Sequence, residues 1–269
     1  MAVASMTFQD VLTNTAKTVL ALDSLPDRLS PQNAIEVVEV RDVTETGNFL
    51  VRDDANGRFA RVLTSGQPWA QKADIVEVGQ AEWMVTLRGR ATQQVRITDI
   101  VPELEGGSCS SPLSGSLVHA PGQGGADVIP LDVTIDAPVP RLTVYAEGDS
   151  KGQEPYFTGA KARNITLDRN ESEAFLIRAQ ANLGYCRWRY RIHYQVDGTT
   201  AELVLNRPDG KPFELTAELP DAGGYTSVYF PSFLCARGGY DPREWFTSTG
   251  KEYASTQHVG VGVPCSQHR

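Results

Sequence analysis

Cysteines are the residues of this sequence best suited to covalent chemistry, at positions Cys109, Cys186, Cys235 and Cys265. No two of them lie close enough to form the paired clips of a zinc site. Widely spaced cysteines in even number are typical of disulfides in an oxidising compartment, and bridges would remove a thiol nucleophile. The alternative is four buried thiols in a cytosolic protein, because cysteine also packs as a small hydrophobic residue. Spacing alone leaves all three pairings open.

A run of basic residues alternates with large apolar residues between positions 187 and 194. The basic set is Arg187, Arg189, Arg191 and His193, and the apolar set is Trp188, Tyr190, Ile192 and Tyr194. Because successive side chains of a strand point to opposite faces, the basic groups would share one face. That face would either dock an anionic partner, such as a wall polymer or an acidic protein, or be neutralised across the sheet by Glu214 and Glu218.

Aromatic residues are concentrated in the glycine-rich segment 220–269. The candidates for binding are Tyr229, Phe230, Tyr240 and Trp245. Exposed rings of this kind anchor partner proteins and stack on sugars. The alternative is that the same rings complete the hydrophobic core, and the sequence favours neither interpretation.

Motifs for catalysis and metal binding do not occur in the sequence. The four histidines lack the HExxH motif and metal-ligand spacing, and there is no GxSxG motif of a serine hydrolase. The glycine-rich stretch 121–126 precedes a predicted strand, whereas a phosphate-binding loop needs a helix there. Asp132 and Asp136 would share a strand face and form either half of a calcium site or a solvated acidic edge. We expect no metal site and no cofactor, and we favour a protein that is not an enzyme.

Strict alternation of apolar and polar residues predicts strands through the middle of the chain. It is clearest in segments 83–88, 95–98, 131–136, 175–179, 188–194 and 213–219. Strands with one buried and one wet face are typical of antiparallel sheets, and short strands between turn signals are typical of a sandwich. Helical periodicity is convincing only over residues 7–22. The predicted fold is an all-β, Ig-like antiparallel β-sandwich with one N-terminal α-helix and a disulfide-fastened C-terminal tail.

The expected organisation has three segments. Residues 1–70 hold the helix and a small β segment, residues 71–220 form the sandwich core domain, and residues 221–269 form an extension packed on that core. The net charge of −8 differs from the clustered basic footprint of a nucleic-acid-binding protein. No run of about 18 apolar residues occurs, so we expect no direct membrane insertion by this chain. A signal peptide is also missing, so we expect any leader or anchor to have been removed.

Six short stretches occur in a recognisable order. They are residues 95–100 (VRITDI), 109–117 (CSSPLSGSL), 121–125 (PGQGG), 156–157 (YF), 185–188 (YCRW) and 209–213 (DGKPF). Together they resemble a family of actinobacterial (Streptomyces-type) proteins of unassigned function, with β-rich extracytoplasmic domains that are often membrane-anchored. The resemblance implies a disulfide between Cys109 and Cys186, and Cys235 and Cys265 are then paired by elimination. It implies no activity.

We therefore expect an extracytoplasmic, non-enzymatic binding or interaction domain on or near the cell envelope. Its partner would be an envelope polymer or another surface protein. One alternative is a hydrolase of cell-wall or extracellular polymer, which a deep polar cleft with two facing carboxylates would favour. The other is a structural subunit of a surface assembly, which an exposed edge strand with a large apolar face would favour.

Overall fold

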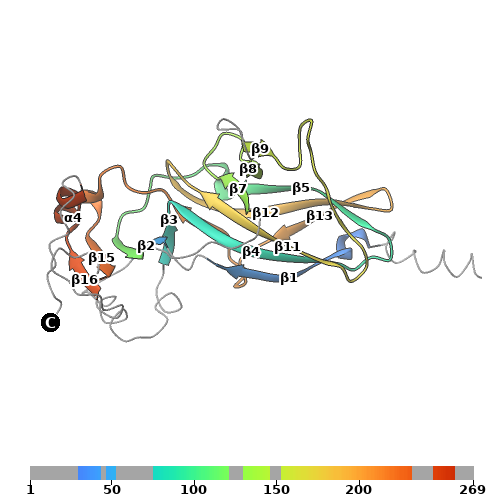
Figure 1. The fold of residues 1–269 in the computed structure, drawn as a ribbon, viewed down its shortest axis with the longest axis horizontal. Coiled ribbons are helices and arrows are strands. Elements are labelled where there is room, and N and C mark those ends of the chain that lie inside the picture. The colour runs from blue at the N-terminus through green and yellow to red at the C-terminus, as the bar shows by residue number, and fades with distance from the viewer. Residues whose placement is uncertain are drawn as a thin grey trace, which may run out of the picture.

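The computed structural model describes residues 30–43, 47–52, 75–120, 130–145, 153–231 and 245–257. The helix predicted over residues 7–22 lies outside these ranges, as do the stretch 121–126, Cys235, Tyr240 and Cys265. The described chain is all-β, with two sheets and one short α-helix (Figure 1). None of its helices is long and apolar enough to cross a membrane.

The smaller sheet has six strands in the order β1–β4–β11–β7–β8–β9. Their bounds are β1 Ile35–Asp42, β4 Gln80–Gly89, β7 Pro130–Thr134, β8 Thr143–Tyr145, β9 Gln153–Pro155 and β11 Ser172–Gln180. Its edge strand β1 contains an irregularity between Val37 and Glu39, where the register with β4 shifts. Bulges and charged residues of this kind protect a sheet edge from pairing with another chain.

The larger sheet has ten strands, in the order β10–β5–β12–β14–β3–β2–β6–β15–β16 with β13 also paired to β12. Their bounds are β2 Gly47–Val51, β3 Ile75–Val78, β5 Val95–Leu104, β6 Ser116–Ala120, β10 Ile165–Leu167, β12 Tyr185–Val196, β13 Thr199–Leu205, β14 Phe213–Thr216, β15 Ser227–Pro231 and β16 Trp245–Ser248. Short helical elements complete the described chain: the 3-10 helices η1 Pro31–Asn33, η4 Glu105–Gly107 and η5 Ala222–Gly224, and the α-helix α4 Gly250–Gln257.

Both sheets are mixed, so the prediction of antiparallel sheets is wrong in this respect. The pairs β11–β7, β14–β3 and β15–β6 are parallel. Alternation in a sequence reports that one face of a strand is buried, and it carries no information on the direction of the neighbouring strand. In each parallel pair, further strands separate the two partners along the chain. That length lets the chain cross over and return in the same direction.

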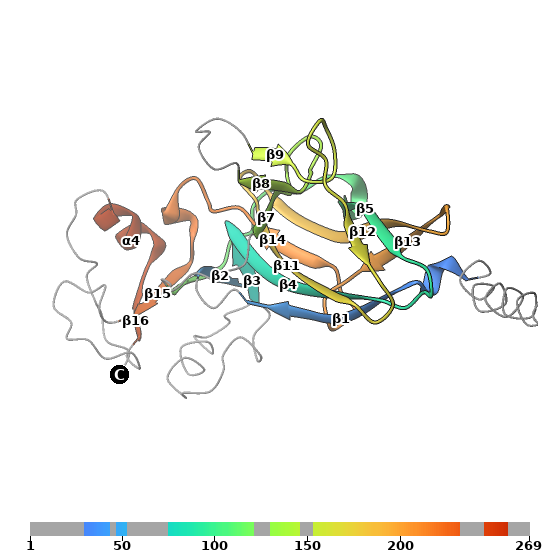
Figure 2. The same ribbon diagram turned by 45° about the vertical axis from the view of Figure 1, so that its right-hand side comes forward.

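The buried faces of the two sheets share one hydrophobic core. Trp83 of β4 meets Trp188 of β12 and Phe213 of β14 edge-on, at ring-centroid distances of 5.8 and 5.0 Å. Contacts of this kind contribute about 0.5–1.5 kcal/mol each beyond the burial of their area. In Figure 2, β1 and β4 of the smaller sheet lie on one side of this core, and β5, β12 and β13 of the larger sheet lie on the other. The predicted alternation on β12 is confirmed, because its apolar set is fully buried: Trp188, Tyr190, Ile192 and Tyr194.

The C-terminal elements extend the larger sheet at one end of the molecule (Figure 1). β15 pairs with β6 on one side and β16 on the other, and α4 contacts η5 and β15. A second hydrophobic cluster lies there, formed by Leu50, Val78, Leu117, Tyr225, Val228, Phe230, Phe246 and Tyr253. The sequence did not predict α4, whose residues have weak apolar periodicity.

Candidate functional site

The disulfide joins Cys109 to Cys186, as the family resemblance implied. Ser110 and Tyr185 exchange two backbone hydrogen bonds of 2.9 Å, so the two cysteines are the next facing pair, with their Cα atoms 4.4 Å apart. Gly184 lies directly beside this bridge. A side chain at Gly184 would collide with the Ser110 carbonyl and crowd the Cys109 Cβ atom, so the sequence has glycine where the two segments meet.

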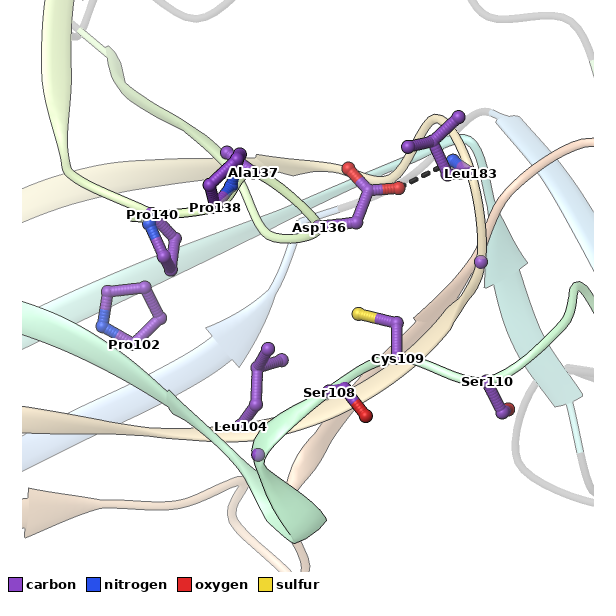
Figure 3. A pocket seen from close by; sticks show the side chains of 12 residues that line it. Pro102, Leu104, Ser108, Cys109, Ser110, Asp136, Ala137, Pro138, Pro140 and Leu183 are labelled. Carbon is purple, nitrogen blue, oxygen red and sulfur yellow. Dashed lines mark hydrogen bonds between the residues drawn. The ribbon is translucent and has the colours of Figure 1, made fainter.

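A groove of about 480 Å³ lies beside the disulfide (Figure 3). We call it the loop groove, and its walls include Pro102, Leu104, Cys109, Asp136, Pro138 and Leu183. Three chain segments converge on it: the one that follows β5, the β7–β8 connection and the β11–β12 turn. Most of the named wall residues are apolar.

Asp136 fixes the rim of the loop groove. Its Oδ2 atom accepts a hydrogen bond of 2.7 Å from the backbone N–H group of Asn182. The same atom accepts a second bond, of 2.5 Å, from the backbone N–H group of Leu183 (Figure 3). The turn is therefore held in place while the Leu183 side chain stays 76% exposed. Val139, between two groove prolines, is 64% exposed. Two large apolar side chains thus stand in solvent on a restrained frame.

The basic face of β12 is a charge-balanced ladder. Arg187 and Arg189 both contact Glu105, at 3.2 and 3.4 Å. Arg191 donates two hydrogen bonds to Glu103, at 2.6 and 2.7 Å, and this bonding lowers the pKa of the Glu103 carboxyl.

Glu202 of β13 completes the ladder by accepting from Arg191 and lying 3.2 Å from His193. Three arginines therefore face three glutamates. One of the two interpretations of the sequence has this face neutralised by Glu214 and Glu218. Glu214 does lie opposite Arg187 on β14, but the ion pairs of the ladder are made by Glu103, Glu105 and Glu202. Tyr185 donates its hydroxyl proton to Glu214, which also pairs with Arg52 and Arg207. Glu218 accepts a hydrogen bond from Asn48.

The aromatic candidates divide between core and surface. Tyr229 and Phe230 are buried, so their interpretation as exposed binding residues is wrong. They lie on β15, which has strands on both edges and helps to form the second hydrophobic cluster. Trp245 is half-buried at the start of β16, opposite Pro231. Tyr240 lies outside the described residues.

The two aspartates proposed as half of a calcium site have separate roles. Asp132 is buried and lies 3.6 Å from Arg178, and burial raises the pKa of its carboxyl. Asp136 is bonded to the β11–β12 turn. Within the described ranges no three histidine, cysteine or acidic side chains are grouped so as to hold a metal ion.

A second hollow, of about 580 Å³, lies at the other hydrophobic cluster. We call it the polar pocket, and its walls include Asn48, His119, Glu218, Asp221, Tyr225 and Tyr253. Asn48 of β2 and His119 of β6 are directly opposite in the sheet. The sequence does not indicate that these residues meet, because His119 and Glu218 are distant along the chain from Asn48 and no short motif links them.

A chain of hydrogen bonds fixes the imidazole of His119. Asn48 Nδ2 donates to Glu218 Oε1 at 3.0 Å, and the Asn48 Oδ1 atom lies 2.6 Å from His119 Nδ1. A carboxylate only accepts, so the amide nitrogen must face Glu218 and the amide oxygen must face His119. Nδ1 therefore donates to Asn48. Burial lowers the pKa of His119, so at neutral pH the ring is uncharged and Nε2 is an acceptor.

Comparison with known proteins assigns neither a family nor a function to this chain. No model of a known protein family matches this chain. A search of curated proteins also finds no significant match.

Proposed function

We propose that this chain is a non-enzymatic binding module of the cell envelope, built as an Ig-like β-sandwich, whose contact surface is the loop groove. The observation that favours it is Leu183, which is 76% exposed although both the disulfide and Asp136 restrain its turn. A large apolar side chain held in solvent has an unfavourable hydration free energy that a partner would remove. Binding loops presented by a rigid scaffold are a common functional arrangement.

The occupant that we propose is an apolar segment of another surface protein. Five of the described wall residues are proline or leucine, and Asp136, the one ionisable side chain among the described walls, already accepts two backbone hydrogen bonds. A polysaccharide would instead need several polar side chains with free hydrogen-bonding capacity. Between the two partner classes that the sequence suggested, the groove therefore favours the protein.

The extracytoplasmic location is part of the same proposal. It is supported by the Cys109–Cys186 disulfide, since such bridges persist mainly in oxidising compartments. Membership of the actinobacterial family that the six stretches resemble is also proposed on this basis. We do not adopt the surface-assembly alternative, because edge strand β1 has a shifted register and the exposed charges of Glu39 and Arg41.

The test compares two pairs of exposed apolar residues. The double variant Val139→Ser/Leu183→Ser, which we call the rim variant, removes the wall residue Leu183 and the exposed Val139, which lies between the wall residues Pro138 and Pro140. The matched control, Val38→Ser/Val204→Ser, removes two valines that are 43% and 41% exposed on strands outside it. A partner is first isolated from the envelope fraction of the source organism and purified, and its affinity for each form is then measured by calorimetry.

We expect the rim variant to bind at least tenfold more weakly than the wild type, because buried anchor residues dominate interface energies. The control should bind as the wild type does. In hydrogen exchange, the amides of residues 182–184 should gain protection in the complex. Equal affinities for both variants, or protection elsewhere on the surface, would refute the groove as the contact surface.

A further inference from the structure

The polar pocket has a different chemistry from the loop groove and stands independently of it. Its formally charged described wall residues are Glu218 and Asp221, and neither lysine nor arginine is among its described walls. The uncharged His119 adds an acceptor nitrogen through Nε2. The pocket therefore offers acceptors and a formal charge of −2, and it requires donors from whatever enters it.

Three contacts bring these groups together. Burial lowers the pKa of His119 and raises the pKa of Tyr225, and the nearby Glu218 carboxylate opposes the first shift and adds to the second. The rings of His119 and Tyr253 are 6.5 Å apart. Glu218, His119 and the two tyrosines therefore surround one space, although they come from β6, α4 and the segment after β14.

The positions of these groups are set before any ligand arrives. Glu218 lies beside Gly79, whose φ of +78° is in the left-handed region that favours glycine. Tyr225 accepts the Leu219 N–H at 3.0 Å, and Asp221 Oδ1 accepts the Gly223 N–H at 2.8 Å. A carboxylate has about four acceptor positions, so both acids retain capacity for a ligand. Preorganised groups of this kind bind with a smaller entropic cost.

We propose that the polar pocket binds an organic ammonium group, with Glu218 and Asp221 supplying the opposite charge and His119 Nε2 accepting an N–H hydrogen bond. The alkyl part of such a ligand would lie against Tyr225, Tyr253 and the neighbouring leucines. Aromatic faces attract ammonium groups in addition to excluding water from them. A free amine and the side chain of a lysine on a partner share this chemistry.

The probes are pairs of ligands of similar shape that differ in charge, so they separate the two contributions to binding. n-Butylammonium is compared with n-butanol, which has the same chain length and no charge. Nα-acetyl-lysine amide represents a lysine side chain, and its Nε-acetylated form is the neutral match. Binding is followed at low salt by the NMR signals of the His119 ring, with an expected Kd for n-butylammonium on the order of 1–10 mM for so small a ligand.

Two variants test the acids. Glu218→Gln removes the charge and keeps an acceptor for Asn48, and Asp221→Asn keeps the Oδ1 acceptor for Gly223. Glu39→Gln makes the same change in charge at an exposed position of β1 outside the pocket. Thermal melting checks that each variant folds. If one of the two pocket variants does not fold, the other is enough to test the proposal.

We expect n-butylammonium to move the His119 signals and n-butanol to leave them unchanged. Each pocket variant should weaken binding by about two- to fivefold, as for partly solvated charge pairs, and Glu39→Gln should have no effect. Tighter binding of Nα-acetyl-lysine amide than of n-butylammonium would identify a lysine side chain as the natural source, and the reverse would identify a free amine. Equal binding of n-butanol, or the same weakening by Glu39→Gln as by the pocket variants, would overturn the proposal.

Discussion

Glu77 is a buried carboxyl at the centre of the larger sheet, on β3 between β2 and β14. Burial, reinforced by the nearby Asp42, raises its pKa to about 8. At neutral pH the side chain is therefore a neutral acid that shares a hydrogen bond with Asp42. An uncharged Glu77 avoids the large free-energy cost of a buried ionised carboxylate next to a second carboxylate, that of the exposed Asp42.

The titration of Glu77 makes the stability of the protein depend on pH. The folded state retains the Glu77 proton up to about pH 8, whereas the unfolded chain releases it near 4.5. The Glu77 contribution to stability is thus complete below pH 4.5 and is lost as the pH rises through 8. At about 1.4 kcal/mol per pH unit, the loss is on the order of 5 kcal/mol.

Glu77→Gln should remove this dependence, because a neutral amide still donates to Asp42 and cannot ionise. We expect the free energy of unfolding of the variant to match that of the wild type near pH 4.5, to exceed it increasingly up to about pH 8, and to keep that excess at pH 9. The measurement is the free energy of urea unfolding across that range. Glu173→Gln, at an exposed position of β11, should follow the wild type throughout. If the difference in unfolding free energy between Glu77→Gln and the wild type did not change with pH, Glu77 would not be the buried neutral acid described above.

At the scale of the element, α4 is held by a capping box at its N-terminus. Glu252 accepts hydrogen bonds from the backbone N–H and the hydroxyl of Thr249, and the Glu252 N–H donates back to the Thr249 hydroxyl. This bonding lowers the pKa of the Glu252 carboxyl. The motif T-x-x-E is visible in the sequence as a start signal for a helix. The residue after Thr249 is Gly250, because any side chain at this position would collide with the carbonyls of Ala222 and Tyr225.

Thr249→Ala should therefore destabilise α4 by about 1 kcal/mol, the usual cost of losing a threonine cap. Because Tyr253 of α4 lies in the second hydrophobic cluster, the loss should appear as faster amide exchange in residues 250–257 and in β15. Ser255→Ala, an exposed change within the same helix, should leave that exchange unchanged. The capping role would be wrong if both variants exchanged at the same rate.

Local patterns in the sequence predicted which residues form strands, but they did not predict which strands lie next to one another in the sheets. Burial of Trp188, Tyr190 and Ile192 follows from a period of two, which a strand imposes on its own residues. The ladder partners Glu103 and Glu202 depend instead on which strands flank β12, and that is decided by the whole sheet. The polar pocket was hidden for the same reason, since Asn48 and Glu218 are 170 residues apart.

For the molecule as a whole, the disulfide determines how the segment after β5 is attached to the core. Its cysteines are separated by 77 residues, so the bridge restricts a large part of the unfolded chain. In the chain-entropy model such a loop stabilises the native state by about 4 kcal/mol. Cys186 is fully buried, and Cys109 is partly exposed in the loop groove.

The variant Cys109→Ala/Cys186→Ala should accordingly lose about 4 kcal/mol of unfolding free energy in urea. It also tests the second predicted bridge, between Cys235 and Cys265. After denaturation without reductant, the variant should show no titratable thiol if that bridge exists, and reductant should destabilise it further. Two free thiols and no response to reductant would refute the second bridge. An unchanged stability relative to the wild type would instead show that the Cys109–Cys186 link does not restrain the unfolded chain.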